Sequence, residues 1–186
     1  MTTQELEGLS LTLPNVGPGP DPLRLADLTA PVEPPDPTTT EAADPAYEFI
    51  VLLLQRDDHC GNCRKQVRAV ADRYAEFRDR RAEVVSIVPE PRETVQKWQD
   101  DYDLPYPLCA DPETEAGELF DQPVRFGPLG RLSDLLGRMP VAIILDVRDP
   151  NNVEIAYSHR GSSTWDRPEI DELLAVIDEL ASQSSE

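Results

Sequence analysis

From residue 47 onward, apolar residues occur in two alternating patterns along the chain. Short continuous apolar runs are typical of buried strands, and apolar residues three or four positions apart are typical of helices. The runs predict strands at 47–55, 83–88, 106–110, 141–147 and 153–159. The spaced sets predict helices at 63–80, 92–102, 114–120 and 167–183, with Pro168 in the first turn of the last one.

The order of these elements predicts an α/β fold. Strands that alternate with helices favour a central sheet with helices on both faces. Asp149-Pro150-Asn151-Asn152 separates the last two strands, and this turn signal predicts an antiparallel hairpin that makes the sheet mixed. We therefore expect one domain over residues 46–183. An insertion at 121–137 should pack on the body or on a partner through its leucines: Leu129, Leu132, Leu135 and Leu136.

Residues 1–45 have a different character. They hold nine of the chain's 19 prolines, and proline fixes φ and removes a hydrogen-bond donor. We expect an extended N-terminal extension in which two short pieces, 11–14 and 23–28, are ordered as a β extension. The stretch 31–44 is expected to be a solvent-exposed loop.

The charge of the chain is strongly negative. The 186 residues carry a formal net charge of −19, which opposes binding to nucleic acid or to anionic membranes because phosphate contacts need a basic face. Lys65 and Lys97 are the only lysines, and an acidic composition with so little lysine is typical of halophilic proteins. The segment 1–7 has neither a basic start nor an apolar core, and no apolar run is long enough for a membrane helix. We expect a cytoplasmic protein.

The residues with the clearest chemistry form a Cys-x-x-Cys motif, Cys60-Gly61-Asn62-Cys63. The motif lies between a predicted strand and a predicted helix. The free N–H groups and the positive dipole at a helix N-terminus favour a thiolate, the reactive form of cysteine. The sequence therefore places redox chemistry at this turn.

Other uses of the cysteines fit the sequence less well. A structural zinc site needs four ligands, but Cys60 and Cys63 supply two, and the sequence has no second Cys-x-x-Cys motif. A c-type haem would need histidine directly after Cys63, where Arg64 stands, and an iron–sulfur cluster lacks a fourth cysteine. We expect no metal and no cofactor. Cys109 lies on a short apolar strand, so packing is its simpler role, with a distant resolving or regulatory thiol as the alternative.

Five segments together resemble a known family. They are 13–15 with 23–28, the turn 56–66, the strand 84–89, Leu-Pro-Tyr-Pro-Leu-Cys-Ala-Asp-Pro-Glu at 104–113, and the strand segment 138–146. They resemble the peroxiredoxin-like branch (alkyl hydroperoxide reductase / thiol-specific antioxidant type) of the thioredoxin superfamily. The resemblance implies a thioredoxin-like fold with an N-terminal β extension, and a catalytic Cys60–Cys63 pair.

The resemblance leaves open which cysteine attacks first. In the spacing P-x-x-x-T-x-x-C of peroxiredoxins, Cys63 takes the peroxidatic position, while Cys60 replaces the threonine and Arg56 replaces the proline. In thioredoxin-like reductases the first cysteine, here Cys60, is the nucleophile and the second resolves. Both orders remain open at this point.

Four further residues are candidate auxiliaries. Arg56 should lower the thiol pKa values, whereas the carboxylates of residues 57 and 58 should raise them. His59 is a candidate thiolate stabiliser or proton donor. The resemblance offers Arg138 as the arginine aimed at a peroxide oxygen, with a plain surface arginine as the alternative. It also offers Pro140 as the cis-proline that faces the cysteine pair.

These observations predict a thiol-dependent oxidoreductase. Its substrate would be a peroxide or a protein disulfide, and a thioredoxin-like or other dithiol would reduce the Cys60–Cys63 disulfide again. The alternative is a non-enzymatic thioredoxin-fold module that binds partners through the leucine-rich insertion and the proline-rich extension.

Overall fold

The structure is a computed structural model, and it describes residues 10–29, 47–124, 137–149 and 152–183. The predicted leucine-rich insertion and the loop 31–44 fall almost wholly outside the described residues. The main sheet has five strands in the order β5-β4-β3-β6-β7. They are β3 (Phe49–Leu54), β4 (Ala82–Val88), β5 (Leu108–Ala110), β6 (Val141–Asp146) and β7 (Glu154–Arg160).

The sheet is mixed, as its sequence pattern predicts. β3 pairs in parallel with β4, and β4 in parallel with β5, whereas β6 runs antiparallel to both β3 and β7. The register brings three chain segments to one edge of the sheet, because Leu54 is opposite Val141 and Val141 is opposite Arg160. The segments after β3, before β6 and after β7 therefore meet at this edge.

The alternation of side chains along β3 divides the core into two layers. Phe49, Val51 and Leu53 face one layer, and Ile50, Leu52 and Leu54 face the other. The first layer is covered by α2 (Gly61–Asp72), α3 (Tyr74–Asp79), α4 (Arg92–Tyr102) and α6 (Ile170–Ser182). The second layer is covered by an N-terminal β extension and by α5 (Glu115–Leu119).

The N-terminal pieces form the expected β extension. β1 (Thr12–Leu13) pairs antiparallel with β2 (Leu23–Arg24), and the short helix η1 (Leu25–Thr29) follows. Apolar side chains from both pieces enter the second core layer, which holds Leu11, Leu13, Leu23, Leu25 and Leu28. The extension therefore belongs to the core of the domain.

The helix predicted at 63–80 is two helices. α2 ends at Asp72 and α3 begins at Tyr74, and at Arg73 the backbone N–H bonds to the carbonyl three residues back, on Val70, at 3.1 Å. The apolar positions of both helices still face the same core layer, which is why the periodicity continues through the break. The last helix is shorter than predicted, since α6 begins at Ile170 and leaves Pro168 before its first turn.

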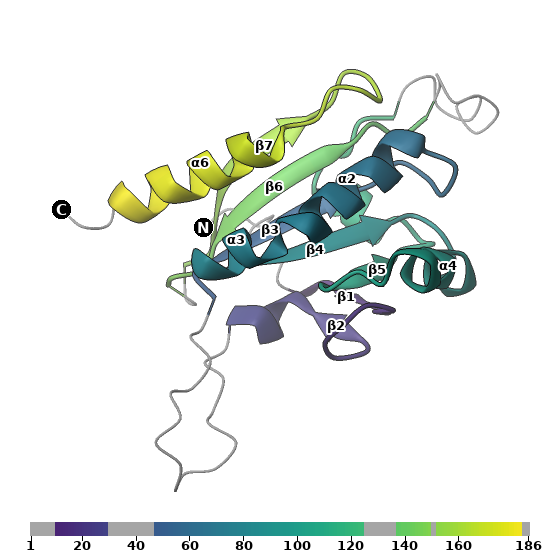
Figure 1. The fold of residues 1–186 in the computed structure, drawn as a ribbon, viewed down its shortest axis with the longest axis horizontal. Coiled ribbons are helices and arrows are strands. Elements are labelled where there is room, and N and C mark those ends of the chain that lie inside the picture. The colour runs from purple at the N-terminus through teal and green to yellow at the C-terminus, as the bar shows by residue number, and fades with distance from the viewer. Residues whose placement is uncertain (1–9, 30–46, 125–136, 150–151, 184–186) are drawn as a thin grey trace, which may run out of the picture.

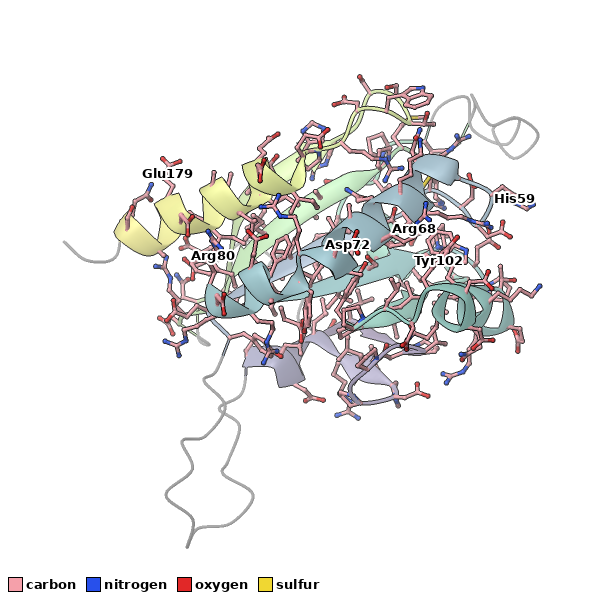
Figure 2. All side chains as sticks on the ribbon, in the orientation of Figure 1. His59, Arg68, Asp72, Arg80, Tyr102 and Glu179 are labelled. Atoms are coloured by element: carbon pink, nitrogen blue, oxygen red, sulfur yellow. A yellow bond between two sulfur atoms is a disulfide. The ribbon has the colours of Figure 1, made fainter. Side chains whose placement is uncertain are left out.

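Charged side chains cover the outward sides of the helices, as Figure 2 shows for Arg68, Asp72 and Glu179, all of them exposed. Between α3 and α6, Arg80 donates two hydrogen bonds to the carboxylate of Asp178, at 2.8 and 3.0 Å. Among the described residues, no helix has the length and apolar character that crossing a membrane requires.

The central strand gives a stability prediction. Leu52 is fully buried in the second core layer, so Leu52→Ala should lower the free energy of unfolding by about 2–5 kcal/mol, through lost burial and the cavity left behind. Chemical denaturation measures this change. Val124→Ala removes a half-exposed apolar side chain and should change the stability by no more than about 0.5 kcal/mol. Equal effects of the two substitutions would contradict this assignment of the core.

Candidate active site

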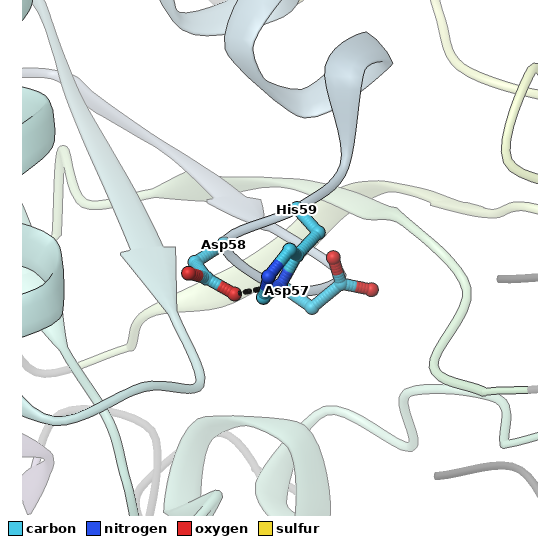
Figure 3. Close-up of side chains that lie close together, drawn as sticks. All are labelled: Asp57, Asp58 and His59. Atoms are coloured by element: carbon cyan, nitrogen blue, oxygen red, sulfur yellow. Dashed lines mark ion pairs between the residues drawn. The ribbon is translucent and has the colours of Figure 1, made fainter. Parts of the chain in front are cut away.

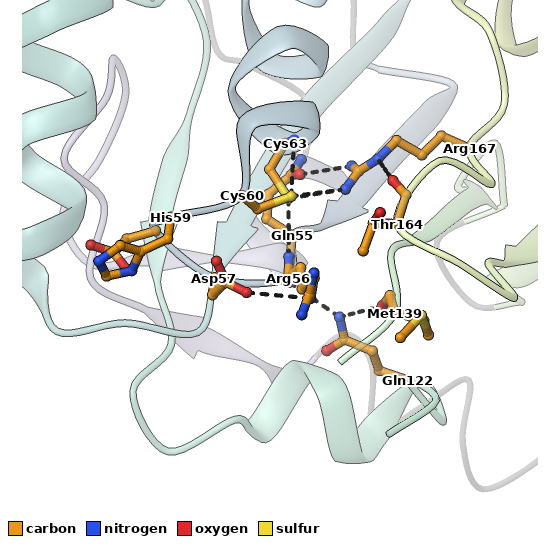
Figure 4. Close-up of polar contacts among 11 residues, drawn as sticks. Gln55, Arg56, Asp57, His59, Cys60, Cys63, Gln122, Met139, Thr164 and Arg167 are labelled. Carbon is orange, nitrogen blue, oxygen red and sulfur yellow. Dashed lines mark hydrogen bonds and ion pairs between the residues drawn. A yellow bond between two sulfur atoms is a disulfide. The ribbon is translucent and has the colours of Figure 1, made fainter. Parts of the chain in front are cut away.

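The Cys-x-x-Cys motif lies at the edge of the sheet where β3 ends and α2 begins (Figure 4). Cys60 and Cys63 form a disulfide with a Cα–Cα distance of 5.2 Å. Cys60 is the N-cap residue of α2, and its Sγ accepts a hydrogen bond from the backbone N–H of Cys63 at 3.2 Å. The sulfur of Cys60 therefore occupies the position where a helix N-terminus favours negative charge.

The two cysteines differ in exposure to solvent. Cys60 retains 8% of its surface exposed, whereas Cys63 retains 0%. The Sγ atom of Cys63 lies beneath the turn, 3.4 Å from the backbone N–H of Arg56. A reactant from solvent therefore meets Cys60 first.

A guanidinium from a distant part of the chain covers the sulfur pair. Arg167, just before α6, places its Nη2 atom 2.9 Å from the Sγ of Cys63 and 3.4 Å from the Sγ of Cys60. Its Nη1 atom donates to the side-chain oxygens of Gln66 at 2.8 Å and Gln55 at 3.2 Å. The side-chain amides of Gln66, on α2, and of Gln55, directly after β3, thus hold the guanidinium in place against both sulfurs (Figure 4).

Arg167 keeps a positive charge at neutral pH. Burial, together with the nearby charge of Arg56, lowers the pKa of Arg167 to about 10, while Asp57 opposes the shift. A cation with this pKa stays protonated at pH 7 and stabilises an adjacent thiolate. The site can therefore hold a thiolate without a metal.

Arg167 was not among the residues expected from the sequence. No motif surrounds it, and 104 positions separate it from Cys63. The predicted topology does contain a signal: if β7 ends at the edge where β3 ends, the segment between β7 and α6 must lie beside the Cys-x-x-Cys turn. The sequence pattern leaves the order of the strands open, so it cannot show that β7 ends at this edge.

Arg138 lies elsewhere. A Cβ atom added to Gly117 of α5 would come within 2.8 Å of the Arg138 guanidinium, so this side chain packs on the helix of the second layer. The guanidinium that contacts the sulfurs belongs to Arg167 instead. An action of Arg138 on a peroxide oxygen therefore stays a prediction.

Pro140 lies at the expected edge, immediately before β6, but the expectation of a cis peptide bond is wrong. Met139–Pro140 is trans, and within the described ranges the cis peptide bond is Asp21–Pro22. The backbone around Pro140 is already paired: Met139 N–H donates to the Pro123 carbonyl at 2.8 Å, and the Pro140 carbonyl accepts from Gly161 N–H at 2.8 Å. These bonds lead the chain into β6 in an extended conformation.

The side chain of Arg56 is buried and faces Asp57, with 3.4 Å between Nε and Oδ2. Its backbone contacts Cys63, and its charge acts on Arg167. His59 is 82% exposed and pairs with Asp58, and its ring lies away from the sulfurs in Figure 4. The geometry therefore favours Arg56 over His59 as an influence on the thiols.

Asp57, Asp58 and His59 are the one group of side chains in the described ranges that could jointly hold a metal ion, with ligand atoms within 4.8 Å of one another (Figure 3). The three residues are consecutive, and His59 is already paired with Asp58. Exposed acidic groups commonly gather without an ion. We propose no metal here.

Cys109 lies on the opposite face of the sheet from the disulfide. It belongs to the second core layer, whereas Cys60 and Cys63 belong to the first. Burial raises the pKa of the Cys109 thiol to about 12, which leaves almost no thiolate at neutral pH. The structure favours the packing role.

This burial gives a reactivity prediction. In the folded, reduced protein at pH 8, iodoacetamide should modify Cys60 and leave Cys109 unmodified, because burial and a raised pKa both suppress the Cys109 thiolate. Peptide mass spectrometry before and after denaturation reads out both sites. Modification of Cys109 in the folded protein at a rate similar to that of Cys60 would show that its environment is wrongly described.

A family model described as the AhpC/TSA family matches residues 25–144, more than half of the chain and inclusive of the Cys-x-x-Cys turn. The chain belongs to the AhpC/TSA family. No curated protein shows significant sequence similarity to it. Its fold is the thioredoxin-like fold that the sequence predicted.

Solved structures of peroxiredoxins have the same fold as this AhpC/TSA protein. The peroxidoxin BcpB of Mycobacterium tuberculosis is 19% identical with a TM-score of 0.66, over 91% of this chain and 92% of that one. The bacterioferritin comigratory protein of Xanthomonas campestris is 13% identical with a TM-score of 0.67, over 95% of each chain. AhpC of M. tuberculosis is 21% identical with a TM-score of 0.62, over 93% of this chain and 89% of that one.

Proposed function

We propose that this AhpC/TSA protein is a thiol-dependent peroxidase in which Cys60 attacks and Cys63 resolves. The observation that carries the proposal is the difference between the two cysteines: Cys60, at the N-cap of α2, keeps 8% of its surface exposed, while Cys63 is fully buried beneath it. Family membership supports peroxide as the substrate, and the similar Xanthomonas structure belongs to a protein with alkyl peroxide reduction activity.

In the oxidative half of the reaction, the Cys60 thiolate attacks one oxygen of the peroxide. The S–O bond forms as the O–O bond breaks, water or an alcohol leaves after taking a proton, and Cys60 becomes a sulfenic acid. The Cys63 thiolate then attacks the sulfur of Cys60 and hydroxide leaves as water after protonation. The product is the Cys60–Cys63 disulfide that the structure contains.

In the reductive half, an external dithiol attacks the more exposed sulfur, that of Cys60. The S–S bond breaks and Cys63 leaves as a thiolate. Arg167 at 2.9 Å and the N–H of Arg56 at 3.4 Å are placed to stabilise that leaving group. The second thiol of the dithiol then releases Cys60, so two electrons pass from the dithiol to the protein.

A second candidate substrate is a protein disulfide. A groove of about 350 Å³ adjoins the site between α2 and the segment before α6, and Asn62, Gln66, Arg167 and Pro168 contribute to its lining. Trp165, a strongly exposed aromatic residue, lies on the same groove. An exposed aromatic side chain near Cys60 favours contact with a polypeptide. The mechanism for a protein disulfide is the same, with a sulfur atom in place of the peroxide oxygen.

The test compares two reactions of the wild-type protein with dithiothreitol as the reductant: consumption of hydrogen peroxide and reduction of insulin disulfides. We expect peroxide consumption to be the faster reaction. Faster insulin reduction would favour the second candidate. If neither reaction occurs and the cysteine pair cannot be reduced or alkylated, the enzyme proposal fails and the partner-binding module becomes the better interpretation.

A further inference from the structure

Arg167 follows directly after a loop, residues 161–166, which begins where β7 ends and leads toward α6. The position of this loop determines whether the Arg167 guanidinium can contact the sulfurs. An arginine side chain on an unconstrained loop would sample many conformations, and ordering it costs free energy. The contacts of Arg167 with both sulfurs therefore depend on what holds this loop in place.

The carboxylate of Asp166 is the centre of the loop's hydrogen bonds. Its Oδ2 atom accepts from the backbone N–H of Ser162 at 2.7 Å and from the Ser162 hydroxyl at 2.8 Å. Its Oδ1 atom lies 2.9 Å from Nε2 of His159, which is on β7. One side chain thus connects the end of the loop to its beginning and to the preceding strand. The same bonds hold the pKa of Asp166 below its usual range.

The start of the loop is fixed to the sheet. Gly161 N–H donates to the Pro140 carbonyl at 2.8 Å. A Cβ atom at position 161 would lie 2.6 Å from the Asp166 carbonyl oxygen and 2.8 Å from the Pro140 ring, so the loop folds back too tightly for any residue but glycine. At the other end, Arg167 Nε donates to the Thr164 carbonyl at 3.0 Å. The loop is a closed unit whose last residue contacts the sulfurs.

We propose that Asp166 is a positioning residue for the redox pair: its carboxylate holds the 161–166 loop in the conformation that places the Arg167 guanidinium on Cys63 and Cys60. The proposal rests on the proposed function of the Cys60–Cys63 pair. It assigns Asp166 no contact with substrate, since it acts through Arg167.

A direct electrostatic role for Asp166 would have the opposite sign. Removing a nearby negative charge would by itself stabilise the thiolate and shift the dithiol–disulfide equilibrium toward the dithiol. Removing a carboxylate that positions Arg167 would withdraw a cation from the thiolate and shift the same equilibrium toward the disulfide. The direction of the shift therefore separates the two roles.

The experiment measures the equilibrium constant of the Cys60–Cys63 pair in glutathione buffers. Asp166→Ala should shift it toward the disulfide by about tenfold, which equals about 30 mV. Asp166→Asn keeps a side-chain oxygen for the Ser162 N–H and should stay closer to wild type. Ser162→Ala, which removes a single hydrogen bond and leaves the charge, should move in the direction of Asp166→Ala by a smaller factor. If Asp166→Ala does not fold, the comparison of the equilibrium constants of Ser162→Ala and wild type tests the proposal, and a shift of Ser162→Ala toward the disulfide supports it.

Two controls complete the design. Asp171→Ala removes a carboxylate from α6 that pairs with Arg73, away from the loop, and should leave the equilibrium constant unchanged. In an Arg167→Gln background, Asp166→Ala should add no further shift, because the group it positions is gone. The inference about Asp166 would be overturned if both Asp166 variants shifted toward the dithiol. It would also be overturned if neither Asp166→Ala nor Ser162→Ala shifted the equilibrium, and the proposed function would stand in both cases. A wild-type pair that never equilibrates with glutathione would overturn the proposed function as well.

Discussion

Cys60→Ser is expected to lose peroxide and disulfide turnover by roughly a thousandfold or more, because a hydroxyl at the N-cap of α2 cannot form the reactive anion near neutral pH. Steady-state consumption of peroxide with dithiothreitol measures the loss. Cys63→Ser should still perform the first attack, but without its resolving partner Cys60 stays a sulfenic acid until an external thiol reduces it. Before any dithiothreitol is added, consumption of about one equivalent of peroxide, and no more, is the expected kinetic result.

Cys109→Ala is the matched control for the loss of a cysteine. It removes the thiol on the opposite face of the sheet from the disulfide and should keep the wild-type rate. Activity that survives in Cys60→Ser and disappears in Cys63→Ser would instead assign the first attack to Cys63. That outcome would match the peroxiredoxin spacing of the motif and contradict the order proposed from exposure.

Arg167→Gln is expected to slow reduction of the disulfide by about 10- to 100-fold, since a charge-assisted hydrogen bond contributes about 1.5–3 kcal/mol. The leaving thiolate of Cys63 loses its 2.9 Å contact with the guanidinium. The pKa of the reactive thiol should rise for the same reason. Stopped-flow reduction by dithiothreitol measures the rate, and the pH dependence of alkylation measures the pKa.

Arg160→Gln is the matched control for the loss of a positive charge. Arg160 ends β7 near the same edge of the sheet, but its guanidinium contacts the Phe120 carbonyl and Asp121. Its replacement should change the reduction rate by less than about twofold. Equal effects of the two substitutions would mean that overall charge, and not the contact of Arg167 with the sulfurs, controls the rate.

The fold was largely predictable because its main signals are local. β3 and β4 are buried on both faces and therefore appear as continuous apolar runs, and α4 has the same bounds as its predicted helix. The break at Arg73 was missed because the apolar spacing continues from α2 into α3. Helix ends and one-residue breaks depend on hydrogen bonds that apolar periodicity does not report.

The site was predictable only where its residues are adjacent in sequence. Cys60 and Cys63 meet because one helical turn joins them, and their strand-to-helix setting is visible in the sequence. Arg167 reaches the pair only because β6 runs antiparallel to β3 and β7 runs antiparallel to β6, so that β7 ends at the same edge of the sheet as β3. The backbone partners of Met139 and Pro140, at Pro123 and Gly161, are likewise distant in sequence.

The order of attack can be tested most directly by trapping the sulfenic acid with dimedone. Each single-serine variant, Cys60→Ser and Cys63→Ser, is reduced, treated with one equivalent of hydrogen peroxide in the presence of dimedone, digested and analysed by peptide mass spectrometry. We expect a dimedone adduct on Cys60 in Cys63→Ser and almost none on Cys63 in Cys60→Ser. An adduct on Cys63 in Cys60→Ser, with Cys60 unmodified in Cys63→Ser, would contradict the proposal that Cys60 attacks first.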